Sequence, residues 1–141
     1  MMFSRKFSSL LFAGALACIA VGCGGTDAPR MHKVTGLVTF DGRPVEEGTV
    51  MFLHDATQDS RQAPLDAEGR YELEVREGQH KIAVEPVIIE TPPSATSPGS
   101  SDYKKAPNIP GRYRSPETSG FTADVTAPAE FNFQMQPGKA K

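Results

Sequence analysis

The stretch Arg70-Tyr71-Glu72-Leu73-Glu74-Val75 decides the fold class of this chain. Tyr71, Leu73 and Val75 alternate with charged residues, so one side of an extended segment would be apolar and the other polar. Successive side chains of a β-strand point to opposite faces, whereas a helix repeats every 3.6 residues. The stretch therefore predicts a strand with one face in a core and the other in water.

The same two-residue period continues on both sides of this stretch. Val34, Val38 and Phe40 share one side of a segment rich in β-branched residues, which fit a pleated, half-buried surface. Strands are expected at residues 34–40, 48–54, 71–75, 80–84, 121–126 and 130–136, with an extension of the fourth toward residue 89. Short strands at such regular spacing predict an all-β domain, a sandwich or a small barrel of about seven strands.

Turns and loops separate these strands. Asp41-Gly42, Glu68-Gly69 and Glu77-Gly78 predict tight turns, because glycine accepts positive φ without a Cβ clash. Residues 55–62 are polar and are expected to form a loop. Residues 90–110 are rich in proline and serine, and such a composition buries too little apolar surface to offset the entropy of ordering. We interpret this second segment as a long exposed loop.

The long loop contains the candidate contact surface of the domain. Loops on a rigid sandwich commonly carry recognition, and here Tyr103, Lys104 and Lys105 combine an aromatic ring with two positive charges. A disordered linker without a binding role is the alternative interpretation of the same composition.

The N-terminus is typical of a secretory signal peptide. Arg5 and Lys6 are the only charged residues before Asp27, and they precede a mostly apolar run over residues 7–21. A positive region followed by a short apolar run is the signal-peptide pattern, whereas a transmembrane helix needs about 20 apolar residues. We interpret residues 1–22 as a cleaved signal-peptide helix and expect the remainder outside the cytoplasm.

The end of this signal resembles the bacterial lipobox, in which small residues precede a cysteine that becomes lipidated. Ala20-Val21-Gly22-Cys23 carries the resemblance and departs from it at Ala20, where leucine is commoner. It implies that Cys23 carries palmitate-type acyl chains and anchors the protein to a membrane. Ala15-Leu16-Ala17-Cys18 is a second candidate that would leave a shorter apolar run. An ordinary cleaved signal with a free Cys23 thiol is the remaining alternative.

The domain plan follows from these boundaries. The lipoprotein signal covers residues 1–22, a flexible Gly- and Pro-containing tether covers 23–31, the β-sandwich covers 32–137, and a polar tail covers 138–141.

Composition argues against several classes of function. The chain carries 15 Lys and Arg against 17 Asp and Glu, with no basic run, so it lacks the charge pattern of a nucleic-acid binder. Its two cysteines, Cys18 and Cys23, both precede the predicted domain, which therefore has no disulfide, thiolate metal site or cysteine nucleophile. His32, His54 and His80 lack zinc-type spacing, and no metal or cofactor is expected.

Three segments in order resemble a carboxypeptidase regulatory-like domain. The first is residues 33–50, which contain Gly36-Leu37-Val38 and Gly42-Arg43-Pro44. The second, residues 66–73, follows the family pattern Asp-x-x-Gly-x-Tyr-x-Leu, and the third, residues 78–84, has His80 where the family usually has tyrosine. The resemblance implies a transthyretin-like (prealbumin-like) seven-stranded antiparallel sandwich. Residues 109–113 and 118–125 are further similar to small bacterial lipoproteins built on this domain, which are generally of unknown specific function.

No catalytic set is evident in the sequence. There is no Gly-x-Ser-x-Gly elbow, and the C-terminal Tyr-Arg-Gly-Ser signature of the transthyretin-like hydrolases is absent. A pilin-type isopeptide bond would need Lys33 and Asn132 to meet near Glu72 or Glu74, but Lys33 lies too early and Asn132 faces outward between two phenylalanines.

We therefore expect a non-catalytic cell-envelope lipoprotein, held to a membrane by its lipid and facing the periplasm or the exterior, whose sandwich serves as an accessory or binding module for an envelope protein or a glycan. A small secreted transthyretin-like hydrolase is one alternative, and it requires His, Arg and Ser to converge on one surface. An extracellular carbohydrate-binding module is another, although the chain has no tryptophan and only three tyrosines for stacking on sugars.

Overall fold

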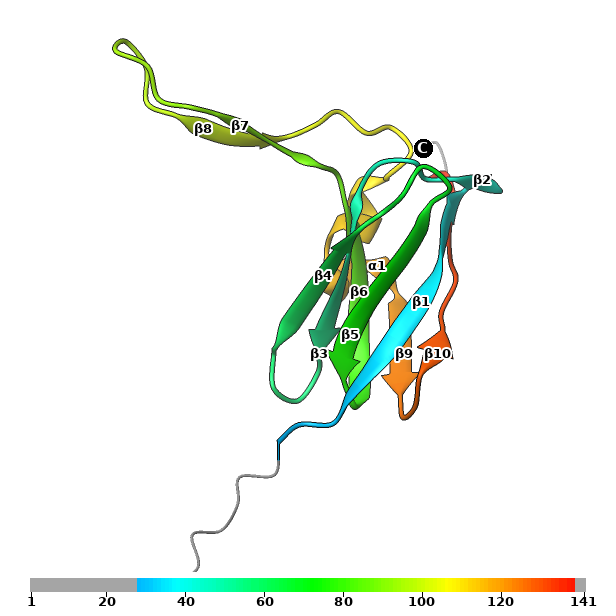
Figure 1. The fold of residues 1–141 in the computed structure, drawn as a ribbon. Coiled ribbons are helices and arrows are strands. Elements are labelled where there is room, and N and C mark those ends of the chain that lie inside the picture. Colours follow the sequence, from blue (N-terminus) through cyan, green and yellow to red (C-terminus); the bar gives the residue numbers. More distant parts are fainter. Residues whose placement is uncertain (1–27, 139–141) are drawn as a thin grey trace, which may run out of the picture.

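The computed structural model of this protein describes residues 28–138, and strands make up most of this part. The strands are β1 (Met31–Phe40), β2 (Arg43–Pro44), β3 (Thr49–His54), β4 (Ser60–Pro64), β5 (Arg70–Arg76), β6 (Gly78–Glu85), β7 (Ile88–Thr91), β8 (Ser100–Tyr103), β9 (Phe121–Val125), β10 (Ala129–Glu130) and β11 (Phe133–Met135). A 3-10 turn, η1 (Gly111–Arg114), and a one-turn helix, α1 (Pro116–Ser119), precede β9. Two sheets face each other, which confirms the predicted all-β sandwich (Figure 1).

The first sheet is built around β1. Its long, regularly alternating sequence lets it pair with β5 on one side, where Val34 lies opposite Leu73 and Gly36 opposite Tyr71. Its other side pairs with β10 and then β11, and these two pairings are parallel. The remaining pairings of the sandwich are antiparallel, so the predicted antiparallel arrangement differs from the structure only where the chain's last segment joins β1.

The second sheet has the order β4-β3-β6-β9. β3 and β6 are central, and every second residue of β3 is buried, which is the pattern expected for a strand with one face in the core. The opposing register aligns Phe52 with Ile82 and His54 with His80. The pairing therefore stacks buried side chains across neighbouring strands.

The core lies between the two sheets. Phe52 is fully buried, and its ring lies 5.9 Å from that of Tyr71 and 6.1 Å from that of Phe133, measured between centroids. Around these rings pack aliphatic side chains from both sheets, including Val34, Val38, Val50, Val75, Ile82, Val84 and Val125. Tyr71 and Phe133 are both buried in it, and Leu73 and Phe131 pack against it half-buried.

The last strand is interrupted, which the sequence did not indicate. Between β10 and β11, Asn132 Oδ1 accepts a hydrogen bond from Leu37 N at 2.8 Å, so a side chain replaces the backbone carbonyl in the ladder. Tyr71 Oη donates to Phe131 O at 2.6 Å, and burial raises the pKa of the Tyr71 hydroxyl. A Cβ on Gly36 would lie 1.8 Å from Phe131 O, so only glycine allows the strands to approach here.

Two segments expected to be loops contain strands. β4 lies within and beyond the predicted polar loop 55–62, and it is an edge strand in which only Ala63 is buried. An edge strand needs few apolar residues, because water solvates its unpaired side. The two-residue hydrophobic alternation is therefore too weak in β4 to be seen in the sequence. Residues 90–110 also differ from the predicted loop: β7 and β8 pair as a two-stranded ribbon over registers from Ile88–Tyr103 to Thr91–Ser100.

We call residues 87–104 the arm. It projects from the end of the sandwich opposite to the one at which the described chain begins (Figure 1). The predicted signal peptide, the predicted lipidation site Cys23, tether residues 23–27 and tail residues 139–141 lie outside the described residues. No helix within residues 28–138 is long and apolar enough to span a bilayer.

Candidate functional site

The arm is formed by a short β-branched sequence and a close-packed tip. Ile88 and Ile89 favour extended backbone, and Pro92-Pro93 ends the first strand because proline cannot continue a ladder. A bridge between Ser94 and Ser97 closes the tip. A Cβ on Gly99 would lie 2.8 Å from Thr91 O, so glycine permits the return of the chain.

The base of the arm is fixed to the sandwich on both sides. Pro86, just before the arm, is fully buried, and Ile109, which follows it, is fully buried in the core. Arg114 holds the returning chain, since its guanidinium donates to Ala106 O at 3.1 Å and to Ile109 O at 2.9 Å. The arm is therefore an extension of the fold with defined ends.

The arm concentrates exposed apolar surface. Among the described residues, five large apolar side chains are exposed, and four of them, Val87, Ile88, Ile89 and Tyr103, belong to the arm. Ile88 is 54% exposed and Tyr103 is 48% exposed. Exposed apolar side chains scattered singly are ordinary, but a contiguous group of them marks an interaction surface.

The three predicted contact residues lie at the base of the returning strand. Tyr103 pairs with Ile88 across the ribbon, and its backbone N–H donates to Asp102 Oδ1 at 2.8 Å instead of to a neighbouring strand. Lys104 Nζ contacts Glu47 Oε2 at 2.5 Å, while Lys105 is exposed. The sequence thus identified the segment, but the composition did not reveal Val87, Ile88 and Ile89 as part of the same surface.

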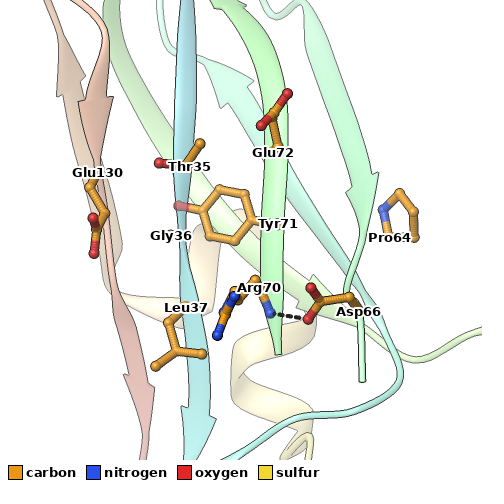
Figure 2. Close-up of a pocket in the computed structure, with 9 residues that line it drawn as sticks. All are labelled: Thr35, Gly36, Leu37, Pro64, Asp66, Arg70, Tyr71, Glu72 and Glu130. Atoms are coloured by element: carbon orange, nitrogen blue, oxygen red, sulfur yellow. Dashed lines mark hydrogen bonds between the residues drawn. The ribbon is translucent and has the colours of Figure 1, made fainter. Parts of the chain in front are cut away.

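A second candidate is an open groove of about 590 Å³ on the outer side of the first sheet (Figure 2). Outward side chains of β1 and β5 line it, among them Thr35, Leu37, Arg70 and Glu72, with Glu130 on the far side. The glycine at position 36 helps to form the floor.

The carboxylates of this groove already have partners. Glu72 Oε1 lies 2.7 Å from Lys33 Nζ, and Glu130 Oε1 accepts from Asn132 Nδ2 at 2.9 Å. Asp66 Oδ1 accepts the backbone N–H of Glu68 and Arg70 and so closes the turn that precedes β5. These groups stabilise local structure, and the groove offers no hydroxyl or imidazole paired as nucleophile and base.

The same contacts bear on the isopeptide hypothesis. Lys33 pairs with Glu72, but Asn132 is engaged with Leu37 N, four positions farther along β1. At ~3.3 Å per strand residue, this separates the two groups by about 13 Å. The structure therefore does not bring Lys33 and Asn132 together, as an isopeptide bond would require.

All three histidines gather at the end of the sandwich where the described chain begins, although their spacing gave no sign of it. The rings of His54 and His80 meet edge to face with centroids 5.0 Å apart. His32 Nε2 lies 3.1 Å from Glu77 Oε2, and His54 Nε2 lies 3.1 Å from the backbone oxygen of the same residue. Only the strand register could have indicated this cluster.

The hydrogen bonds define the protonation of the buried pair. His54 Nδ1 accepts from Thr57 N at 3.1 Å, so the ring proton is on Nε2 and is donated to Glu77 O. His80 Nδ1 donates to Gly78 O at 3.0 Å. Burial lowers the pKa of His80, and the neighbouring His54 lowers it further against the opposing effect of the Gly78 carbonyl. Burial and the lowered pKa of His80 therefore favour its neutral form.

A hydrolase would need a nucleophile beside these histidines, and Ser119 does not lie there. Ser119 is buried, donates to Ile82 O and accepts from Phe121 N at 3.1 Å. Thr57 Oγ1 contacts His54 Nδ1 at 3.1 Å, but the same nitrogen accepts the Thr57 N–H and so caps the turn. A cavity of only about 40 Å³ adjoins the pair. Within residues 28–138, no three His, Cys, Asp or Glu side chains are placed to hold a metal ion.

Comparison with solved structures gives partial matches of low sequence identity. No protein-family model matches the sequence, and no curated protein matches it. A DUF3823 family protein from Parabacteroides merdae is similar with a TM-score of 0.42 and 14% identity, over 79% of this chain and 48% of that one. A DUF3823 family protein from Bacteroides ovatus is similar with a TM-score of 0.44 and 13% identity, over 74% of this chain and 44% of that one. This chain spans about half the length of those proteins.

Proposed function

We propose that this chain is a non-catalytic lipoprotein of the bacterial cell envelope, and that its carboxypeptidase regulatory-like sandwich presents the arm to a partner. The lipid on Cys23 would hold the protein to the membrane, and the sandwich would face the periplasm or the exterior. The signal-like N-terminus and the lipobox-like Ala20-Val21-Gly22-Cys23 support the anchor.

The observation that carries the binding role is the exposed apolar surface of the arm. Ile88, Ile89 and Tyr103 are each about half exposed, whereas Met31 is the only exposed large apolar side chain outside the arm in the described part. Burial of apolar surface is the main driving force of association, at about 25 cal/mol per Å². A protein surface that covers the arm would therefore gain from contact that the sandwich itself does not provide.

The position of the arm suits this role. The described chain begins at one end of the sandwich and the arm leaves from the other (Figure 1). A short tether at the first end would leave the arm free to reach a partner beyond the membrane surface. Within residues 28–138 the Ser119 hydroxyl is engaged with backbone groups and the groove carboxylates Glu72 and Glu130 are partnered, and we take these contacts as support for a binding role.

Metabolic labelling tests the anchor. Cells that express the full chain are fed radioactive palmitate, and label in the protein is measured for the wild type, Cys23→Ala and Cys18→Ala. We expect label in the wild type and in Cys18→Ala but not in Cys23→Ala. Stable membrane association is expected because each buried CH₂ contributes ~0.8 kcal/mol and more than one acyl chain is attached. An unlabelled wild type, or label that persists in Cys23→Ala, would refute the proposal.

A further inference from the structure

The two edges of the arm differ in what they can pair with. Lys104 N donates to Val87 O at 2.8 Å, so these residues form a hydrogen-bonded pair. Hydrogen-bonded and non-bonded pairs alternate in an antiparallel ribbon, which makes Ile88 and Tyr103 a non-bonded pair. Their backbone N–H and C=O groups therefore point away from the ribbon, toward its two free edges.

The β7 edge is poorly suited to receive another strand. Pro86 and Pro92 flank it and lack the N–H that a ladder requires. Glu90 lies in its middle, and symmetric pairing at this residue would place two carboxylates opposite each other.

The β8 edge is better suited, because its flanking prolines, Pro98 and Pro107, leave a longer proline-free run than Pro86 and Pro92 leave around β7. Residues 100–106 contain no proline, and the outward N–H of Tyr103 is occupied only by the neighbouring Asp102 side chain. Charges of opposite sign, Asp102 and Lys104, lie symmetrically on either side of Tyr103. An unpaired edge of this kind is a template for strand addition.

We infer that the partner of the arm is a second copy of this chain, joined through antiparallel β8–β8 pairing with Tyr103 at the two-fold axis. The inference rests on the arm being the contact element of the proposed function. The outward groups of Tyr103 would form a hydrogen-bonded pair with those of the partner's Tyr103, in agreement with the alternation established by Val87 and Lys104. The two ribbons would become one four-stranded sheet.

This register assembles the exposed apolar side chains. Ile88 lies directly across from Tyr103 within the ribbon, so the pairing would create a row of Ile88, Tyr103, the partner's Tyr103 and the partner's Ile88 on one face. Cross-strand contacts between aromatic and β-branched side chains stabilise a sheet, and a two-stranded ribbon alone is marginal in water. Association would supply the packing that each ribbon lacks.

The same register matches the charges. Asp102 falls opposite the partner's Lys104, and by symmetry Lys104 falls opposite the partner's Asp102. Within residues 28–138 Asp102 forms no ion pair, and its carboxylate accepts only the Tyr103 N–H. Lys104 contacts Glu47, but an ammonium group has three donors, so a second carboxylate can be accommodated.

Cysteine cross-linking in envelopes tests the register. Opposed Cα atoms in a hydrogen-bonded antiparallel pair are about 5.5 Å apart, within the range of about 4.4–6.8 Å that a disulfide spans. We expect Tyr103→Cys to form covalent dimers under mild oxidation, whereas Glu90→Cys, on the other edge of the same ribbon, should not. Monomeric Tyr103→Cys, or equal cross-linking of both variants, would overturn the inference.

Sedimentation of the full chain in detergent provides a test that keeps Tyr103. The wild type is expected to dimerise, Asp102→Lys to dimerise about tenfold more weakly, and Asp102→Lys combined with Lys104→Asp to recover. Glu47→Gln removes only the contact within one chain and should leave dimerisation unchanged. A wild type that remains monomeric at all concentrations, or an Asp102→Lys variant that associates as well as the wild type, would contradict the proposed pairing.

Palmitate labelling of the same samples separates this inference from the anchor. Labelled protein without Tyr103→Cys dimers overturns the self-association and leaves the anchor standing. Dimers in unlabelled protein support the self-association and refute the anchor.

Discussion

The rings of His54 and His80 lie edge to face, 5.0 Å apart, at opposing positions of β3 and β6. His80 is 2% exposed and also contacts Phe52 edge to face, so it occupies an aromatic position in the core. Each ring uses a defined tautomer, because Thr57 N donates to His54 Nδ1 and His80 Nδ1 donates to Gly78 O. Two imidazoles with fixed hydrogen-bond partners are thereby built into the end of the sandwich nearest the start of the described chain.

This pair predicts that the fold loses stability in mild acid. The pKa of His80 in the folded state is lowered by burial, so the unfolded chain binds its proton more readily. The stabilisation is complete above the ordinary histidine pKa of about 6.5 and is lost as the pH falls toward the lower folded value.

Thermal melts at neutral and mildly acidic pH measure this effect. His80→Phe keeps a ring in the core but cannot be protonated, so its melting temperature should fall less between the two pH values than that of the wild type. An equal fall in both proteins would show that the acid sensitivity arises elsewhere.

The close approach of β1 and the last strand predicts that Gly36 is intolerant of substitution. In Gly36→Ala the new methyl group would lie 1.8 Å from Phe131 O and 2.8 Å from the Tyr71 hydroxyl. Overpacking of a well-packed site typically costs ~1–3 kcal/mol, and here backbone would have to move, so we expect at least the upper value in urea unfolding. Gly111→Ala is the matched control: nothing lies within 4 Å of its Cβ position, and a change below ~0.5 kcal/mol is expected. Similar effects of the two substitutions would contradict this account of the strand contact.

The arm is predicted to contribute little to the stability of the isolated chain. Ile88 is 54% exposed, so Ile88→Ser should change the free energy of unfolding by less than ~0.5 kcal/mol. Ile109, just beyond the arm, is fully buried, and Ile109→Ala should cost ~2–5 kcal/mol in the same urea titration. A large loss in Ile88→Ser would mean that the arm belongs to the core and is not an element held out for binding.

The parts that could be predicted from sequence are those with a local signal. The alternation over Tyr71, Leu73 and Val75 gave a strand with the correct buried face, since Tyr71 and Val75 are buried and Glu72 and Glu74 are exposed. The Glu68-Gly69 turn also has a local cause, because Gly69 has a φ of 75° and Asp66 closes the turn.

The parts that could not be predicted depend on register or on edges. The His54–His80 contact exists only because β3 and β6 pair in one particular register, which no spacing in the sequence encodes. β4 has one buried residue, Ala63, so its period is too weak to detect. The strand predicted toward residue 89 covers Ile88 and Ile89, which begin β7, but the prolines and serines of residues 90–110 predict a loop and conceal the pairing of β7 with β8.

Thiol accessibility tests the central claim, that the arm is covered by a partner in the envelope. A cysteine is introduced at exposed Ser101 on β8 or at exposed Asp124 on β9, and each is reacted with a charged maleimide in intact envelopes. We predict that the thiol of Ser101→Cys reacts at least about tenfold more slowly than the thiol of Asp124→Cys. A tenfold lower rate requires only ~1.4 kcal/mol of favourable free energy for covering the arm. Equal reaction rates at the two positions would show that the arm is bare, and they would contradict the account.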